Sequence, residues 1–442
     1  MPDSRGRPGR PRAGPDQAVT EPVRRFRLTA DWVVPVTSPP IRHGAVLLGD
    51  DGRIESIGPA AVVPAPPGVP DLDFASAALL PGLVNAHTHL ELTGLAGAVE
   101  PADFACWIRG VRELKASRPA GWFRDAARQG IRDAFAAGIT TVFDTGDSGE
   151  VLPALAEAGG AGVVYQEVFG PDPRQTAESL AGLEARVTAL RRFETARARL
   201  GVSPHAPYTV SGPLYRAVAA YARRESLPIA VHLAESPAES AFVVRHEGPF
   251  ADAWAARGIP PLEWNQGPGG AHRSPVAWLD RHGVLGPATL CIHTVQLDTD
   301  DIRILADRGV AIAHCPISNQ RHGHGTAPAA ALRQAGIRMG VGTDSVISVG
   351  TLDLFAEMRA TRALLGVGAA EALALGTIEG ARLVGGTDWG WLGVGAWADV
   401  IAVDLPGPGS AAVEEAVLAA GPAAVRATFA SGNPVYRRGQ AA

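Results

Sequence analysis

The sequence of 442 residues lacks any run of about eighteen apolar residues, so no transmembrane helix is expected. Its N-terminus also lacks the apolar core of a signal peptide. Cysteine is scarce, and Cys106, Cys291 and Cys315 lie far apart in the sequence. An odd number of widely spaced cysteines indicates reduced thiols and argues against a disulfide framework. We therefore expect a cytoplasmic protein.

The sequence also lacks a strong excess of charge of either sign, since its formal net charge is −5. This balance argues against bulk binding of nucleic acids or anionic membranes by the folded body. Residues 1–22 are rich in Arg, Pro and Gly and are predicted to form a disordered tail. The piece "RGRPGRPR" in this tail is similar to an AT-hook, a minor-groove DNA-binding segment, but its composition favours simple disorder.

The domain organisation follows from where strand-like patterns occur. Short alternating strands near the N-terminus, such as "GAVLLGDDGRIESIG", recur only near the C-terminus, in "GVGAWADVIAVDL". We expect both ends to build one small β-sandwich domain, from residues 23–80 and 386–442. The length of the chain suits a large barrel beside such a domain. A homodimer is compatible with the sequence.

Residues 81–385 alternate apolar, strand-like runs with helical segments, a pattern typical of a parallel sheet in an α/β fold. Eight runs are present, the number that closes a TIM (β/α)8 barrel. They cover residues 82–89, 139–146, 162–170, 200–207, 229–235, 289–294, 310–316 and 338–344.

Each of these runs carries an ionisable side chain at or near its C-terminal end. The active site of a TIM barrel lies at this face, so the repetition over eight runs predicts one shared site. A single such residue would more often be structural. The residues are His87, His89, Asp144, Glu167, His205, His232, His293, His314 and Asp344.

The spacing of His87 and His89 predicts a metal site. Side chains of a strand alternate between faces, so both imidazoles point the same way, about two rises of 3.3 Å apart. His232 and Asp344 can complete a set that suits one divalent ion, with Zn²⁺ favoured over Fe²⁺ and one position left for water. The single lysine, Lys115, lies on no strand end, which excludes a lysine-bridged metal pair. A pair bridged by Glu167 remains an alternative.

Five motifs in order, "PGLVNAHTHLEL", "VHLAES", "CIHT", "HCPISN" and "VGTDS", resemble those of the amidohydrolase superfamily, in its deaminase and chlorohydrolase branch. The resemblance covers about residues 26–437. It implies that the ligands of one metal are His87, His89, His232 and Asp344. It also implies that Glu235 shuttles protons, that His293 contacts the hydrolytic water or the developing oxyanion, and that His205 lies on the substrate side.

The chemistry of these residues supports the same roles. A bound metal lowers the pKa of its water toward about 7, and Asp344 can accept a proton from that water. Glu235 can protonate a ring nitrogen of an amidine-like substrate, as a non-ligand glutamate does in unrelated zinc deaminases. His293 can stabilise charge on the tetrahedral intermediate. The alternative role for Glu235 is to cap the helix that follows it.

The segments "DFACWIRGVREL", "EVFG" and "GTDSVISVGTLDLFAEMR" most resemble aminodeoxyfutalosine deaminases of the alternative menaquinone route. The resemblance implies a purine nucleoside substrate, 6-amino-6-deoxyfutalosine, with Glu91 binding ribose hydroxyls. Arg109, or another arginine on the same segment, would meet the benzoate in a bidentate pair. Trp107, Glu167 and His205 are further expected substrate contacts.

The chain departs from this pattern in two places. Val349 stands where relatives usually carry Asn, and the loop "RHGHG", with His322 and His324, is unusual. Alternative substrates are S-adenosylhomocysteine, methylthioadenosine and adenosine, followed by those of guanine-type deaminases or chlorohydrolases and by amides. A non-catalytic scaffold would be expected to lose metal ligands, whereas every ligand position here is filled. Asp144 and His314 are predicted to be structural, and His322 and His324 to be loop histidines near the substrate.

Overall fold

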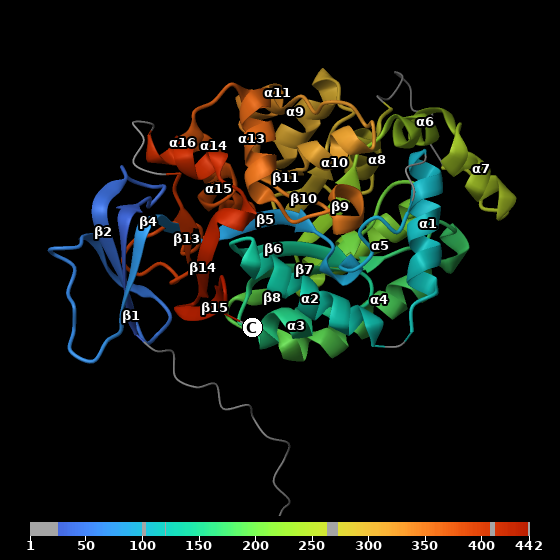
Figure 1. Cartoon of the computed structure of the whole chain (residues 1–442). Coiled ribbons are helices and arrows are strands. Elements are labelled where there is room, and N and C mark those ends of the chain that lie inside the picture. Colours follow the sequence, from blue (N-terminus) through green and yellow to red (C-terminus); the bar gives the residue numbers. More distant parts are fainter. Residues whose placement is uncertain (1–24, 100–102, 120, 263–272, 407–411, 441–442) are drawn as a thin grey trace, which may run out of the picture.

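The computed structural model describes residues 25–99, 103–119, 121–262, 273–406 and 412–440. Eight parallel strands form a nearly closed barrel in the order of the sequence (Figure 1). The predicted (β/α)8 fold is therefore confirmed. The barrel strands are β5 (Leu83–Thr88), β6 (Ile139–Gly146), β7 (Ala161–Val168), β8 (Ala198–Pro204), β9 (Ile229–Leu233), β10 (Thr289–His293), β11 (Ala311–His314) and β12 (Arg338–Val341).

The barrel strands are short and buried along nearly their whole length, because helices cover one face and the packed interior covers the other. The register places Ile292 of β10 opposite His232 of β9, so the polar ends of neighbouring strands meet at one face of the barrel. Across the closure, the Asp344 N–H after β12 donates to the His87 carbonyl of β5 at 3.0 Å.

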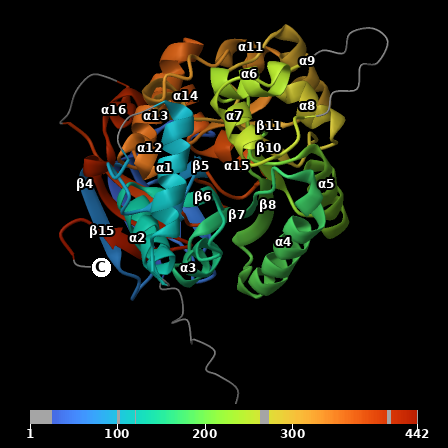
Figure 2. The same cartoon turned by 90° about the vertical axis from the view of Figure 1, so that its right-hand side faces the viewer.

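Helices follow the strands and form the outer layer (Figures 1 and 2). The first of them, α1, lies on the side of the barrel away from the second sheet, and Figure 2 looks onto that side. The helices are α1 (Phe104–Ala116), α2 (Trp122–Ala136), α3 (Val151–Glu157), α4 (Thr176–Leu190), α5 (Gly212–Glu225), α6 (Pro237–Arg245), α7 (Pro249–Ala256), α8 (Pro275–Arg281), α9 (Thr299–Arg308), α10 (Pro316–Arg321), α11 (Ala329–Gln334), α12 (Val346–Val349), α13 (Leu354–Leu365), α14 (Ala369–Leu375), α15 (Ile378–Arg382) and α16 (Val413–Ala419).

A second sheet takes its strands from both ends of the chain, as predicted for the small β-domain. Its seven strands form one sheet in the order β15-β14-β13-β4-β1-β2-β3. The predicted tail, residues 1–22, lies outside the described residues. The strands are β1 (Phe26–Val33), β2 (Ile41–Leu48), β3 (Ile54–Pro59), β4 (Asp71–Pro81), β13 (Val400–Asp404), β14 (Val425–Ala430) and β15 (Asn433–Arg437).

A buried ion pair joins this sheet to the barrel. Arg197, just before β8, contacts both carboxylate oxygens of Asp399, just before β13, at 2.6 and 2.7 Å. Asp399 also accepts the Ser431 N–H at 2.8 Å.

None of the helices within the described residues has the length and apolarity that crossing a membrane requires. All three cysteines are free thiols, and only Cys106 is exposed.

Candidate metal and catalytic site

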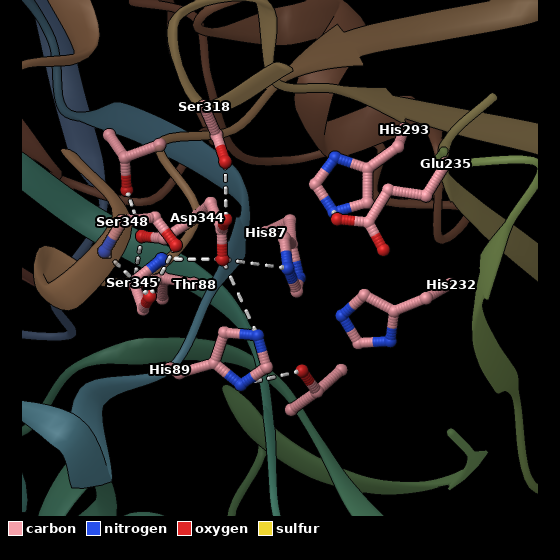
Figure 3. A network of polar contacts seen from close by, with 12 residues as sticks. His87, Thr88, His89, His232, Glu235, His293, Ser318, Asp344, Ser345 and Ser348 are labelled. Atoms are coloured by element: carbon pink, nitrogen blue, oxygen red, sulfur yellow. Dashed lines mark hydrogen bonds and ion pairs between the residues drawn. The ribbon is translucent and has the colours of Figure 1, made fainter. Parts of the chain in front are cut away.

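Three imidazoles and one carboxylate converge at the C-terminal end of the barrel (Figure 3). The Nε2 atoms of His87 and His89 each lie 3.5 Å from Asp344 Oδ1. The His232 ring lies 5.0 Å from the His87 ring and 5.5 Å from the His89 ring, measured between centroids. The structure thus brings together the four side chains that the sequence predicts as metal ligands.

These side chains fit a divalent metal. His87 is fully buried, and neither of its ring nitrogens has a hydrogen-bond partner among the described residues. Such orphaned nitrogens are rare in native structures and call for an explanation. One ligand atom from each of His87, His89 and Asp344 lies within 4.8 Å of the others, and the same holds for His87, His232 and His293. Nitrogen-rich sets of this kind suit zinc.

The protonation states also fit a metal site. Burial, followed by the charge of His87, lowers the pKa of His89 to about 4. Burial likewise lowers the pKa of His232 well below its usual range. Burial alone would raise the pKa of Asp344, but the His87 ring, 3.5 Å away, holds it well below its usual range. Neutral imidazoles and an ionised carboxylate are the forms that bind metal.

The backbone around Asp344 is shaped to aim its carboxylate. Asp344 has a positive φ of 63°, a conformation that costs a non-glycine residue about 1–3 kcal/mol. The Ser318 hydroxyl donates to Oδ2 at 2.6 Å and the Ser345 N–H donates to Oδ1 at 2.6 Å. A Cβ on Gly342 would lie 2.6 Å from the backbone nitrogen of His87, so only glycine allows the chain after β12 to approach β5 this closely.

Glu235 lies just after β9, beside this cluster. Its Oε1 atom is 3.4 Å from His293 Nε2. Burial raises the pKa of Glu235 well above its usual range, which favours the protonated carboxyl. The capping role considered for Glu235 is wrong, because the N-cap of α6 is Ser236, whose hydroxyl accepts the Glu239 N–H at 3.2 Å. The Glu239 carboxylate accepts the backbone N–H groups of Ala234 and Glu235, both at 2.8 Å, and so fixes the turn that carries Glu235.

His293 is oriented by Asn319 of α10. With the amide as placed, Asn319 Oδ1 must accept, so His293 Nδ1 carries the hydrogen of this 2.9 Å contact. His293 Nε2 then carries the lone pair of the ring and can accept a hydrogen bond. His293 is thereby close enough to both Glu235 and the His87 ring, at 5.7 Å between centroids, to act at the same reacting centre.

The predicted substrate residues fall into different environments. Glu91 is buried in the short helix η1 (Leu90–Leu92) and contacts Lys115 Nζ of α1 at 2.5 Å. It also accepts the Ser148 N–H at 2.9 Å. Burial alone would raise the pKa of Glu91, but the charge of Lys115 lowers it to about 2. Glu91 is thus an ionised carboxylate, and Lys115, which sequence reasoning used only to exclude a bridging role, is its partner.

The two other predicted contacts on α1 differ in exposure. Trp107 is buried, and its ring lies 4.5 Å from the ring of His322. Arg109 is exposed on the surface of α1. Trp107 therefore faces the loop that carries His322, whereas the structure does not bring Arg109 into a buried contact.

Glu167 and His205 lie close to His232. One ligand atom from each of the three residues lies within 4.8 Å of the others. The Oε1 atom of Glu167 is buried with no hydrogen-bond partner among the described residues, and burial raises the pKa of Glu167 well above its usual range. The His205 ring nitrogen Nδ1 contacts the Thr209 hydroxyl at 2.9 Å. Their spacing is compatible with the predicted substrate contacts and with the alternative of a second metal at Glu167.

Asp144 and His314 are the two strand-end residues that the sequence predicts to be structural. Asp144 accepts the Leu90 N–H at 2.6 Å and so anchors η1 to β6. His314 is buried, and burial lowers its pKa to about 4.

The sequence predicts His322 and His324 only as loop histidines near the substrate, and it did not single out Tyr208. The structure places His324 Nδ1 3.5 Å from Glu235 Oε1, and a hydrogen bond from Tyr208 acts on the same carboxyl. The sequence feature that could have indicated a role for these histidines is "HGHG", in which each histidine is followed by a glycine.

Known proteins share this chain's family and architecture. Residues 78–435 match the Amidohydrolase family. A 5-methylthioadenosine/S-adenosylhomocysteine deaminase of Syntrophobacter fumaroxidans is 31% identical over 371 residues, which cover 81% of this chain and 79% of the relative. A zinc-bound adenosine deaminase from Xanthomonas campestris superposes with a TM-score of 0.78 at 27% identity, covering 92% of both chains.

A more distant solved structure, the aminofutalosine deaminase of Helicobacter pylori, has a TM-score of 0.77 at 21% identity and covers 93% of this chain and 100% of its own. At this identity it supports the fold alone. The resemblance that the motifs indicated is confirmed, together with the expectation of a hydrolase. The chain belongs to the amidohydrolase family.

Proposed function

We propose that this protein hydrolytically deaminates an adenine nucleoside that is modified at its 5′ end. One observation carries the proposal: the buried Glu235 carboxyl, whose pKa burial raises, lies beside three imidazoles and the Asp344 carboxylate. This arrangement supplies a proton donor next to a place where water can be activated, which deamination of a cyclic amidine requires. The names of the relatives point to the same substrate class.

The metal in this proposal is one divalent ion, Zn²⁺ rather than Fe²⁺, held by His87, His89, His232 and Asp344. When bound there, such an ion lowers the pKa of water and so makes a nucleophile available at neutral pH. The nitrogen-rich ligand set supports this choice, and so does the zinc in the related adenosine deaminase.

The chain's own residues divide the proton transfers. Asp344, ionised and fixed by Ser318 and Ser345, accepts a proton from the attacking water. Glu235 donates its proton to the ring nitrogen next to the amino-bearing carbon, which makes that carbon electrophilic. Asp344 then passes its proton to the departing amino group, and Glu235 recovers a proton from the hydroxyl of the intermediate. The reaction thus converts the nucleoside and water into the hypoxanthine nucleoside and ammonia. His293, with its hydrogen on Nδ1, can accept a hydrogen bond from the attacking water at Nε2 and so help to orient it.

The finer choice of substrate in the proposal is 6-amino-6-deoxyfutalosine, as the motifs around α1 indicate, which would place the enzyme in menaquinone biosynthesis. The buried and ionised Glu91 supports a ribose-bearing substrate, since a carboxylate can accept two hydroxyl hydrogens. Methylthioadenosine and S-adenosylhomocysteine are the alternatives that the relative's name supports.

The test is a deamination screen on the purified protein, followed by loss of the adenine ultraviolet band and by ammonia release. The panel contains 6-amino-6-deoxyfutalosine, methylthioadenosine, S-adenosylhomocysteine, adenosine, guanine and an acylated amide. Turnover of one or more adenine nucleosides is expected, and the highest kcat/KM identifies the substrate. Hydrolysis of the amide alone would contradict a deaminase. In parallel, metal analysis of wild type and His232→Ala should find about one ion per chain in the former and loss of the ion in the latter.

A further inference from the structure

The loop after α10 brings a second histidine to the proton-donating carboxyl. His324 is 2% exposed, and its Nδ1 atom lies 3.5 Å from Glu235 Oε1. Neither ring nitrogen of His324 has a hydrogen-bond partner among the described residues. A buried polar group without a partner is destabilising, so a role in the working enzyme would explain why a histidine lies here.

The backbone of this loop is held so that His324 points inward. The His324 N–H donates to the Asn319 carbonyl at 2.9 Å, and Gln296 Nε2 donates to the His324 carbonyl at 2.5 Å. Gly323 and Gly325 flank His324 with φ of 65° and 103°, which lets the chain turn on both sides of it. Both the direction and the depth of the imidazole are therefore fixed by the fold.

Asn319 connects this loop to His293. Its side chain accepts from His293 Nδ1 and its backbone carbonyl accepts from His324, each at 2.9 Å. The two imidazoles then approach one and the same oxygen, Oε1 of Glu235, at 3.4 and 3.5 Å. A single residue of α10 thus places two rings on one carboxyl oxygen.

Aromatic rings from α1 cover this arrangement. Phe104 lies edge-on to His324 at 4.5 Å between centroids, and Trp107 lies 4.5 Å from His322. Rings packed in this way exclude water, and the lowered local dielectric strengthens a hydrogen bond between His324 and Glu235. Because these rings exclude water, the 3.5 Å contact between His324 Nδ1 and Glu235 Oε1 is electrostatically stronger than the same contact at the surface would be.

We propose that His324 is a positioning residue that acts through Glu235. Its Nδ1–H donates to Oε1, so the acidic proton stays on the other oxygen, Oε2, which is turned toward the ring nitrogen of the substrate. His324 keeps its own hydrogen throughout, and the proton that reaches the substrate comes from Glu235. The inference rests on the proposed deaminase function and adds a residue to its proton-transfer machinery.

Three variants at one position test the proposal, because Asn and Gln place a nitrogen donor differently. His324→Asn keeps a donor near the position of Nδ1, whereas His324→Gln keeps one near Nε2. We expect His324→Leu and His324→Gln to lower kcat by about 10- to 100-fold, the effect of a misplaced catalytic group, with KM nearly unchanged. His324→Asn should recover most of this loss.

The matched control is His43→Asn. His43 is an exposed histidine of β2 with a φ of 47°, a conformation that Asn also tolerates, so this variant should match wild type.

Each other outcome has a definite meaning. Equal loss in all three variants, with unchanged metal content and melting temperature, would overturn positioning and leave packing as the role of His324. A rise in KM at constant kcat would also overturn it, because His324 would then contact the substrate itself. The Asn and Gln variants are both polar, so their comparison decides the question even if His324→Leu does not fold. If wild type deaminates no member of the panel, the proposed function fails, which is distinct from an active wild type with three equally impaired variants.

Discussion

Burial raises the pKa of the Glu235 carboxyl and so favours its protonated form, and Glu239 fixes the turn that carries it. Glu235→Gln keeps the shape and neutrality of this group but removes the proton that it can transfer. We expect kcat to fall by about 10²- to 10⁴-fold, the usual contribution of a general acid, while metal content stays constant. Steady-state kinetics and metal analysis, with exposed Glu247→Gln as control, check this. A variant that keeps wild-type kcat would remove Glu235 from the chemistry.

His314 allows a prediction about acid stability that is independent of catalysis. Burial lowers its folded-state pKa to about 4, against about 6.5 in the unfolded chain. Between these values the unfolded state binds more protons, so this histidine's contribution to stability is lost as pH falls from 6.5 toward 4. In His314→Leu that loss is absent. Urea unfolding of both proteins at pH 7.5 and pH 5 should therefore show the variant gaining about 2 kcal/mol relative to wild type on acidification, from 1.36 kcal/mol per pKa unit. Parallel pH profiles would contradict the buried, neutral state of His314.

At the scale of elements, the site depends on how α1 is fastened to the barrel. Lys115 of α1 contacts Glu91 of η1 and Asp147 after β6, both at 2.5 Å, and so ties the helix to two strand ends. Lys115→Met would leave the buried Glu91 charge without its cation, which costs on the order of 3 kcal/mol. We expect a lower melting temperature and a raised KM for a nucleoside, with a smaller KM change for the free base. Arg112→Met, exposed on the same helix, is the stability control, and equal KM changes for nucleoside and free base would separate Glu91 from the ribose.

The elements differ in how far the sequence alone could predict them. The eight barrel strands were predictable because each is a buried apolar run that ends in a polar residue, and His87, His89, His232 and Asp344 follow from that register. The fastening of Glu91 by Lys115 was not predictable, since the two residues lie on different elements and neither follows a periodic pattern. The inward direction of His324 also escaped prediction, because in a glycine-rich loop the backbone hydrogen bonds to Asn319 and Gln296, rather than strand alternation, set where the side chain points.

At the scale of the whole molecule, the two ends of the chain meet in one sheet, and the Arg197–Asp399 pair couples that sheet to the barrel. Both side chains are nearly fully buried, and Asp399 also holds the Ser431 N–H between β14 and β15. Such a pair adds little over an apolar contact when intact, but removing one charge leaves the other buried and unpaired. The pair lies before β8 and β13 and contributes no group to the catalytic cluster, so its loss should act on stability alone.

Asp399→Asn therefore separates stability from catalysis. We expect the variant to lose about 3–5 kcal/mol in the free energy of unfolding, because Arg197 keeps its charge without a carboxylate partner. Its kcat per folded molecule should equal that of wild type, since the strand ends that carry the site are untouched. Denaturant unfolding of wild type, Asp399→Asn and the exposed control Asp73→Asn on β4 measures the free energy of unfolding. Steady-state kinetics well below the unfolding transition measure kcat. A variant with unchanged stability would show that the sheet and the barrel are held together by their apolar contacts, whereas a lowered kcat in fully folded protein would mean that the sheet helps to shape the catalytic end of the barrel.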